Sequence, residues 1–182
     1  MSKSLELPDG PGAVQGNVSR EVDTVNEVYF YGHTKDWGFL SNFYKVPGGF
    51  EYTGFHFTTS EHALMFAKAV LMGDGESAVK IHRVSVPLQA KRLGRKVKPW
   101  DQAKWEAHCE HLMRDILVAK FSNPVMKTKL EETLGKALFE ASPRDKIWGI
   151  GIGKEKALSG TPHNGRNLLG KALMCARDIV FA

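Results

Sequence analysis

The sequence predicts one compact domain of the mainly α (α+β) class, with a small β-hairpin portion near the N-terminus. Apolar residues recur at helical steps of three and four after residue 59, whereas the alternation typical of strands is confined to short runs. The length of 182 residues and the hydrophobic content of 42% also suit a single globular domain with a substantial core.

The β portion is expected at the start of the folded domain, which we place at residues 27–182. Residues 1–26 contain Gly, Pro and Ser without a sustained period and are predicted to form a flexible tail. The run V-Y-F-Y (28–31) is β-prone. After the turn at residues 47–49, the alternation of residues 50–58 predicts a second strand or a hairpin.

Helices are predicted for most of the remaining chain. The hydroxyl of Thr59 or Ser60 is expected to cap the first helix by accepting from a backbone N–H that has no helical partner. Capping residues, prolines and glycines then divide the chain into further helices at 76–84, 87–94, around 105–119 and at 124–135, a short strand at 137–141, and a last helix at 166–180.

The helix that begins T-S-E-H carries two charges on its apolar side. Seven residues span about two helical turns, so Glu61 and Lys68 share one stripe with Leu64 and Met65. An unpaired ion is costly to bury, and amphipathic helices therefore keep charges off this face. The pattern indicates either a functional site or two long side chains that reach solvent at the edge of the core.

The charge balance favours anionic partners. The formal net charge is +5 and the sequence pI is about 9.2, which suits phosphates, nucleotides or nucleic acid. Five of the eight residues in K-R-L-G-R-K-V-K (91–98) are basic. Arg95 follows Gly94 at an expected helix end, so it is either a directed phosphate contact or part of a solvated face.

No apolar run approaches the roughly 20 residues of a membrane span, and no secretory signal is recognisable at the start of the chain. We therefore expect no membrane partner and a cytoplasmic or nuclear location. Cys109 and Cys175 form no C-x-x-C pair, and both are expected to be buried free thiols. His108, Cys109 and His111 lack a second cluster that would complete a zinc site, so no metal is predicted.

Two Gly-containing stretches near the C-terminus are candidate ligand sites. Gly149 and the glycines after it match no phosphate-loop motif, and they form either a wall that lets backbone approach a ligand or a tight turn. Residues 164–167 begin the last helix, where free N–H groups suit an anion, unless Asn164 is simply a cap. Gly149 is accordingly predicted as a substrate contact.

Two tryptophans are candidates for binding an aromatic base. Trp105 heads an amphipathic helix and also suits the core. Trp148 lies in a Gly-rich loop three residues after Asp145, which is a poor position for core filling. A Trp face beside a carboxylate is a good receptor for a planar base next to its sugar.

Seven stretches in order carry a family resemblance that covers about residues 28–182: F-Y-G-H…F-L-S-N-F (30–43), T-S-E-H with its lysine (59–68), K-R-L-G-R (91–95), Trp105, A-K-F (119–121), E-A-S-P-R-D-K-I-W-G-I-G (140–151) and G-R-N-L-L-G-K-A-L-M (165–174). In these the chain resembles the YbiA-like or NADAR domain family, N-glycosidases of NAD- and ADP-ribose-linked biology. The resemblance implies a compact helical YbiA-like fold and cleavage of a bond between ribose and a base or amine, without a cofactor.

The resemblance also implies roles for individual residues. The catalytic set is Glu61, Lys68 and Asp145, and the predicted ligand contacts are Asn42, Arg95, Trp105, Trp148, Arg166 and Asn167. Lys68 has two open roles: a neutral amine that attacks C1′ and forms an imine with the opened ribose, or a cation that pairs with Glu61 or a phosphate.

The implied substrate is a phosphorylated ribosyl-base or an ADP-ribose-type ligand. The first expectation is hydrolysis of ADP-ribose from guanine bases, including those of ADP-ribosylated DNA or RNA. The alternatives are hydrolysis of ribosylamino-pyrimidine phosphates of riboflavin biosynthesis, and a non-catalytic module that binds ADP-ribose or nucleic acid.

Overall fold

The computed structural model of the protein describes residues 26–182, so the predicted tail lies outside the described residues except for Asn26. Helices dominate, as expected for the mainly α (α+β) class, and strands are short. In chain order the elements are β1 (Glu27–Phe30), the 3₁₀ turn η2 (Gly38–Leu40), β2 (Phe50–Tyr52), β3 (Phe55–Phe57), α1 (Ser60–Leu71), α2 (Gly75–Arg83), α3 (Pro87–Gly94), α4 (Gln102–Ser122), α5 (Pro124–Glu131), β4 (Ala137–Glu140), α6 (Lys154–Leu158) and α7 (Leu168–Val180).

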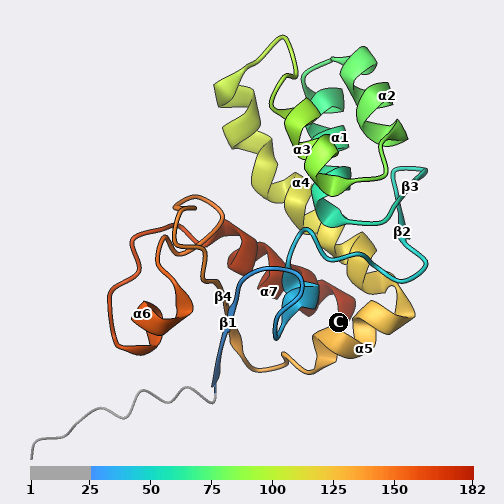
Figure 1. Cartoon of the computed structure of the whole chain (residues 1–182). Coiled ribbons are helices and arrows are strands. Elements are labelled where there is room, and N and C mark those ends of the chain that lie inside the picture. The colour runs from blue at the N-terminus through green and yellow to red at the C-terminus, as the bar shows by residue number, and fades with distance from the viewer. Residues whose placement is uncertain (1–25) are drawn as a thin grey trace, which may run out of the picture.

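The long helix α4 connects two parts of the domain (Figure 1). Its N-terminal half lies at the top of the view beside α1, which also packs against α2 and α3, and its C-terminal half leads to α5 and runs past α7. The strands β1 and β4 and the helix α6 lie on the other side of α7. Residues from both parts meet beside α4, where the candidate site is found.

Two small sheets accompany the helices. The expected hairpin is confirmed, because β2 and β3 pair antiparallel with Phe50 opposite Phe57. The second sheet pairs β1 with β4 in parallel, from Glu27 opposite Ala137 to Phe30 opposite Glu140. The sequence analysis expected both strands but not this pairing, since they lie more than 100 residues apart. Parallel pairing places the C-terminal end of β4 next to the C-terminal end of β1. The segments that follow the two strands both contribute residues to the site.

The core is formed by the inward faces of α1, α4 and α7. Residues with 0% exposed surface include Ile81 of α2, Met113, Ile116 and Leu117 of α4, and Leu173 of α7. Within the described residues, no helix is both long and apolar enough to cross a membrane. The core thus holds α1, the helix that carries Glu61 and Lys68, against α3 and α4.

Three local expectations need correction. The last helix begins at Leu168 and not at Arg166, and its N-cap is Asn167 in the left-handed conformation, so Asn164 does not cap it. Helix α6 was not expected, because its five residues lie among turn residues. Cys109 is buried as expected, whereas Cys175 is exposed because it lies on the outer face of α7.

Candidate active site

A cavity of about 320 Å³ lies where α1, α3 and the start of α4 meet the segment after η2 and the loop after β4. Cavities of about 460 and 570 Å³ elsewhere contain none of the predicted catalytic or ligand residues. The smaller cavity contains seven of the ten. Its lining consists of Ser41, Asn42, Phe43, Glu61, Leu64, Met65, Lys68, Lys91, Arg95, Trp105, Glu140, Asp145 and Trp148.

Helix α1 supplies the floor of the cavity through the stripe expected from the sequence. Thr59 caps the helix, and its hydroxyl accepts from the N–H of His62 at 3.2 Å. Glu61, at the first turn, donates its backbone N–H to the carbonyl of Asn42 at 2.9 Å, which ties the helix start to the segment that forms the opposite wall. The expectation that Glu61 and Lys68 share one face is confirmed, because both line the cavity.

Glu61 is a buried carboxylate, with 5% of its surface exposed. Burial raises its pKa above the ordinary value, and the nearby cations Lys91, Arg95 and Lys68 oppose this effect. Its ion-pair partner is Lys91, whose Nζ lies 3.4 Å from Oε1. The sequence left open an ion pair between Glu61 and Lys68. The structure instead pairs Glu61 with Lys91.

Lys68 lies between aromatic rings and the cavity. Its Nζ is 4.4 Å from the ring centroid of Trp100 and 5.4 Å from that of Trp105. Burial lowers its pKa, Glu61 partly reverses the shift, and Arg95 adds to it. A lysine in such a pocket holds a larger share of neutral, nucleophilic amine than a solvated one.

Helix α3 lies close enough to α1 for its cations to reach Glu61. Gly94 allows this approach, because a Cβ at that position would overlap with Sδ and Cγ of Met65 on α1. Lys91 and Arg95, one turn apart, therefore both line the cavity. Of the five basic residues in 91–98, these two are directed at the site.

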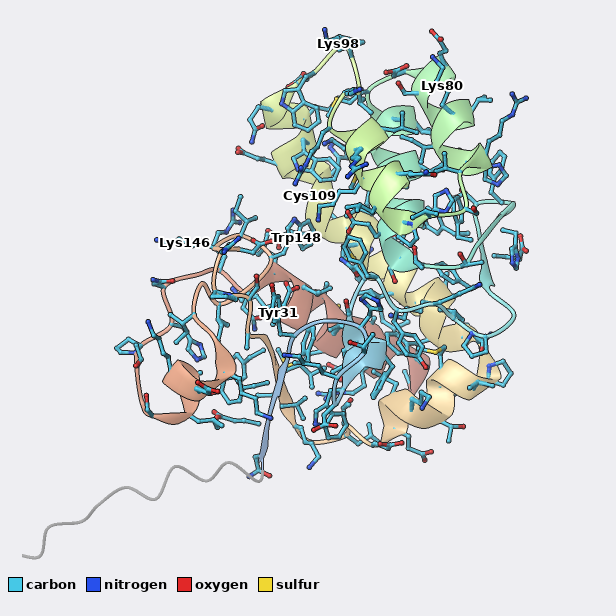
Figure 2. The ribbon with its side chains drawn as sticks, viewed as in Figure 1. Tyr31, Lys80, Lys98, Cys109, Lys146 and Trp148 are labelled. Carbon is cyan, nitrogen blue, oxygen red and sulfur yellow. The ribbon has the colours of Figure 1, made fainter. Side chains whose placement is uncertain are left out.

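The loop after β4 places Asp145 and Trp148. Oδ1 of Asp145 accepts the backbone N–H of Ile147 at 2.9 Å and that of Trp148 at 2.8 Å. The carbonyl of Trp148 accepts from Leu169 N–H at 3.0 Å, which anchors the loop on α7. Figure 2 shows Trp148 in the loop that also carries Lys146, and its ring lines the same cavity as Trp105.

Sequence reasoning missed four polar or aromatic wall residues: Ser41, Phe43, Lys91 and Glu140. Glu140 ends β4 and has its pKa raised to about 7, first by burial and then by the neighbouring Asp145. Its Oε2 and Oδ1 of Asn42 are buried and have no hydrogen-bond partner among residues 26–182. Lys91 could have been suspected because it lies in the basic segment 91–98. Glu140 could have been suspected only because it begins the stretch 140–151 that resembles the family.

Three predicted ligand contacts do not line the cavity. Arg166 is exposed and pairs with Glu110 at 3.2 Å. The side chain of Asn167 is engaged within the fold, because it accepts from Glu140 N–H at 3.0 Å and donates to the Leu138 carbonyl at 2.9 Å. Gly149 is enclosed by backbone, and a Cβ there would meet the carbonyl oxygens of Asp145 and Glu140.

The backbone N–H groups of residues 166–169, at the start of α7, are not free to bind an anion. The N–H groups of residues 166–169 donate, in order, to the carbonyls of Lys146, Gly149, Ile147 and Trp148. The sequence could not show that a loop more than 15 residues upstream takes these donors. They hold the loop against α7 and so position Asp145 and Trp148.

Several known proteins resemble this chain over most of its length. The model of the NADAR domain matches residues 29–180. The chain is 35% identical to N-glycosidase R617 of Acanthamoeba polyphaga mimivirus over 86% of its own length and 98% of that protein. It is 33% identical to N-glycosidase YbiA of Escherichia coli over 86% and 88% of the two chains.

Two further matches extend the comparison. The riboflavin biosynthesis protein VVA0006 of Vibrio vulnificus is 33% identical over 83% of this chain, which corresponds to 38% of that protein. The solution NMR structure of the Escherichia coli protein YbiA superposes with a TM-score of 0.69 and 30% identity, over 86% of this chain and 85% of that one. By the domain match and by fold, the chain belongs to the NADAR family.

Proposed function

We propose that this chain removes ADP-ribose from guanine bases by hydrolysing the C1′–N bond, with Lys68 as the nucleophile and Glu61 and Asp145 as the catalytic carboxylates. The coarser function, a hydrolase of N-glycosyl compounds, is that of its relatives R617 and YbiA and of this chain. The observation that carries the proposal is the meeting of a buried carboxylate, a desolvated lysine and two tryptophans in one cavity.

The polar groups match the charges that develop in the reaction. Breaking a ribosyl C1′–N bond builds positive charge at C1′, which a carboxylate stabilises when it is held close in a dry site. Glu61 is held by Lys91 and Asp145 by two backbone N–H groups, so neither has to reorganise as charge develops. The neutral fraction of Lys68 attacks C1′, and water then releases the sugar from the resulting imine.

The aromatic residues of the cavity are suited to the base of the ligand, and the basic residues are suited to its phosphates. Trp105 and Trp148 offer ring faces for the base. Lys91 and Arg95 lie on the side from which the basic segment 91–98 continues to the surface, and this segment suits the two phosphates of ADP-ribose. The unpartnered Oδ1 of Asn42 requires a donor, which a ribose hydroxyl or a base N–H supplies.

One side-by-side assay tests the proposal. Purified protein is incubated with ADP-ribosylated guanosine and with a ribosylamino-pyrimidine phosphate, and release of the free base is followed by chromatography. We expect the first to be cleaved with the higher kcat/KM. Preferential cleavage of the ribosylamino-pyrimidine phosphate would instead indicate a role in riboflavin-type chemistry. Binding of ADP-ribose without release of base from either substrate would indicate a non-catalytic binding module.

The riboflavin-type substrate is retained as a second candidate because of one specific observation. The matched protein from Vibrio vulnificus bears a riboflavin biosynthesis name. A cavity of about 320 Å³ is at the lower end of small-molecule sites, which suits a mononucleotide-sized ligand as well as the reacting end of ADP-ribose.

A further inference from the structure

Glu140 is a half-buried residue with a buried carboxyl oxygen, Oε2, and the proposed mechanism does not use it. It lies at the end of β4, lines the cavity together with Glu61 and Asp145, and its Oε2 has no hydrogen-bond partner among residues 26–182. A buried polar atom without a partner is costly, and such atoms are rare unless a ligand or a functional role accounts for them.

The backbone around Glu140 is held firmly. Its N–H donates to Asn167 Oδ1 at 3.0 Å, and its carbonyl accepts from Ser142 and Ile150, each at 2.8 Å. Pairing of β4 with β1 fixes the strand on the other side. The carboxyl is thus presented to the cavity from a rigid strand end, which is the arrangement that a group with a defined reaction geometry needs.

The three carboxyl groups of the cavity have different partners. Glu61 has a cation at 3.4 Å, and Asp145 Oδ1 accepts two backbone N–H groups. Glu140 forms no ion pair with any described residue, although Lys91 is near enough to act on it at longer range. Glu61 thus has a cation beside it and Asp145 has two N–H donors, whereas Glu140 has neither, and burial of its carboxyl group favours the protonated form.

We propose that Glu140 is the general acid of the reaction, and that it delivers its proton to the nitrogen that leaves C1′. This inference rests on the proposed N-glycosidase function and adds to it a residue with a separate role. A nitrogen that departs with the bonding electron pair is a poor leaving group unless it gains a proton as the bond breaks.

The step balances as follows. The C1′–N bond breaks, its electron pair stays on the base nitrogen, and that nitrogen takes the proton from Glu140. The neutral amine of Lys68 forms the new bond to C1′. Water then gives its hydroxyl to C1′, and the bond between C1′ and Lys68 Nζ breaks, which restores the neutral amine. The remaining proton of that water returns to the Glu140 carboxylate, so the enzyme leaves the cycle unchanged.

The charges that face Glu140 are consistent with this role. Glu61 and Lys68 come from α1, Lys91 and Arg95 from α3, and Asp145 from the loop that follows β4. Burial and the carboxylates of Asp145 and Glu61 raise the pKa of Glu140 to about 7, and Lys91 opposes them. A general acid works best when its pKa lies near the pH at which the enzyme operates.

The experiment compares Glu140→Gln and Glu140→Asp with wild type, and uses Glu131→Gln, an exposed carboxyl at the end of α5, as the matched control. kcat is measured from pH 5 to pH 10 on whichever ribosyl substrate wild type cleaves. The Gln variant keeps the shape but has no proton to give, so we expect kcat to fall by about 10²- to 10⁴-fold. We also expect it to lose an ionisation near pH 7 that wild type and Glu131→Gln show.

Glu140→Asp keeps a carboxyl at a longer distance, so partial activity and a retained ionisation are expected. A Gln variant with wild-type kcat, or with reduced kcat and the same ionisation as wild type, would overturn the assignment. If the Gln variant does not fold, the Asp variant decides, and unchanged kcat with an unchanged pH profile would reject Glu140.

Failure of the proposed function is recognised separately. In that case wild type itself releases no base from either substrate. The carboxyl can still be titrated directly by NMR of protein labelled with ¹³C at the glutamate carboxyl carbons, with Glu140→Gln used for assignment. A resonance that titrates near pH 7 is expected for Glu140, and titration in the ordinary range of an exposed glutamate would overturn the inference.

Discussion

Two lysines of this protein, one fully buried and one half-buried, occupy opposite kinds of environment. Lys120 of α4 is fully buried, and its Nζ donates to the carbonyls of Phe39 at 2.7 Å and Ser41 at 3.1 Å. Lys68 of α1 lies beside tryptophan rings and an open cavity, and its Nζ has no hydrogen-bond acceptor among the described residues.

The comparison shows that removing a lysine from water does not by itself make it available to a ligand. Burial lowers the pKa of both amines, to about 7 for Lys120. A neutral amine has two hydrogens, and in Lys120 two carbonyls accept them, so no ligand can approach. The amine of Lys68 lies beside the cavity instead. A lowered pKa therefore marks both a structural and a candidate catalytic lysine, and only the surroundings of the nitrogen distinguish them.

The largest effect is expected from Lys68→Arg, which keeps the positive charge but cannot deprotonate at usable pH. We expect turnover to fall by more than about 10³-fold, with product binding retained. Borohydride added during turnover should attach the sugar to wild-type protein at Lys68 and leave the Arg variant unmodified, as judged by peptide mass mapping. Lys80→Arg, at an exposed lysine paired with Glu76, is the control. Full activity in Lys68→Arg would make Lys68 an electrostatic clamp.

Glu61→Gln is expected to have the next largest effect, because the amide keeps the shape and loses the charge that matches the transition state. Turnover should fall by about 10²-fold or more, whereas the melting temperature should change little. Glu76→Gln, an exposed carboxyl on α2, is the control. Near-normal turnover would remove Glu61 from the mechanism.

Trp148→Ala tests whether the cavity beside Lys68 binds a base. A stacked aromatic contributes about 1 to 3 kcal/mol to binding, so KM should rise by about 5- to 150-fold. The control Trp37→Ala changes a half-buried tryptophan outside this cavity and should lower thermal stability more than activity. If Trp148→Ala instead lowers the melting temperature strongly with little effect on KM, core filling is its main role.

Lys120→Met should show the opposite balance to Lys68→Arg. Two buried carbonyls lose their donor, at a cost of roughly 1 to 3 kcal/mol each in the free energy of unfolding. Turnover per folded molecule should change by less than about tenfold, since Lys120 does not line the cavity. A loss of turnover as large as that of Lys68→Arg, at unchanged stability, would contradict the comparison.

A pH dependence of stability, with no expected effect on turnover, is the last prediction. The pKa of Lys120 in the folded protein, about 7, lies below its ordinary value of 10.5, so between these values the unfolded chain binds more protons. The free energy of unfolding of wild type should therefore rise with pH across this window relative to Lys120→Met. Urea denaturation at several pH values measures the difference, and parallel curves would show that Lys120 does not titrate there.

The sequence predicted what depends on local geometry. Helical spacing alone set Glu61, Leu64, Met65 and Lys68 on one face, and the structure places all four on the cavity floor. The β hairpin was likewise indicated by a short alternating run between turn residues. Such features follow from the period of one element and need no knowledge of its neighbours.

What the sequence could not predict depends on contacts between distant elements. Lys91 could not be told from the other cations of its run, because its pairing with Glu61 depends on how closely α3 approaches α1 at Gly94. The donors at the start of α7 looked free until the loop at 146–149 was seen to accept them. Glu140 reaches the cavity through the pairing of β4 with β1, which leaves no local pattern.

The parallel pairing of β1 with β4 also has a consequence for how the protein is made. Helix α1 contacts α3 and α4 within residues 60–122, whereas β1 must wait for residues 137–140 to be synthesised. Contacts across such a separation form late, because the intervening chain must first be ordered. A nascent chain that ends before β4 holds Glu61 and Lys68 but lacks Glu140, Asp145 and Trp148. The cavity around Lys68, the proposed nucleophile, is thus complete only when nearly the whole domain has left the ribosome.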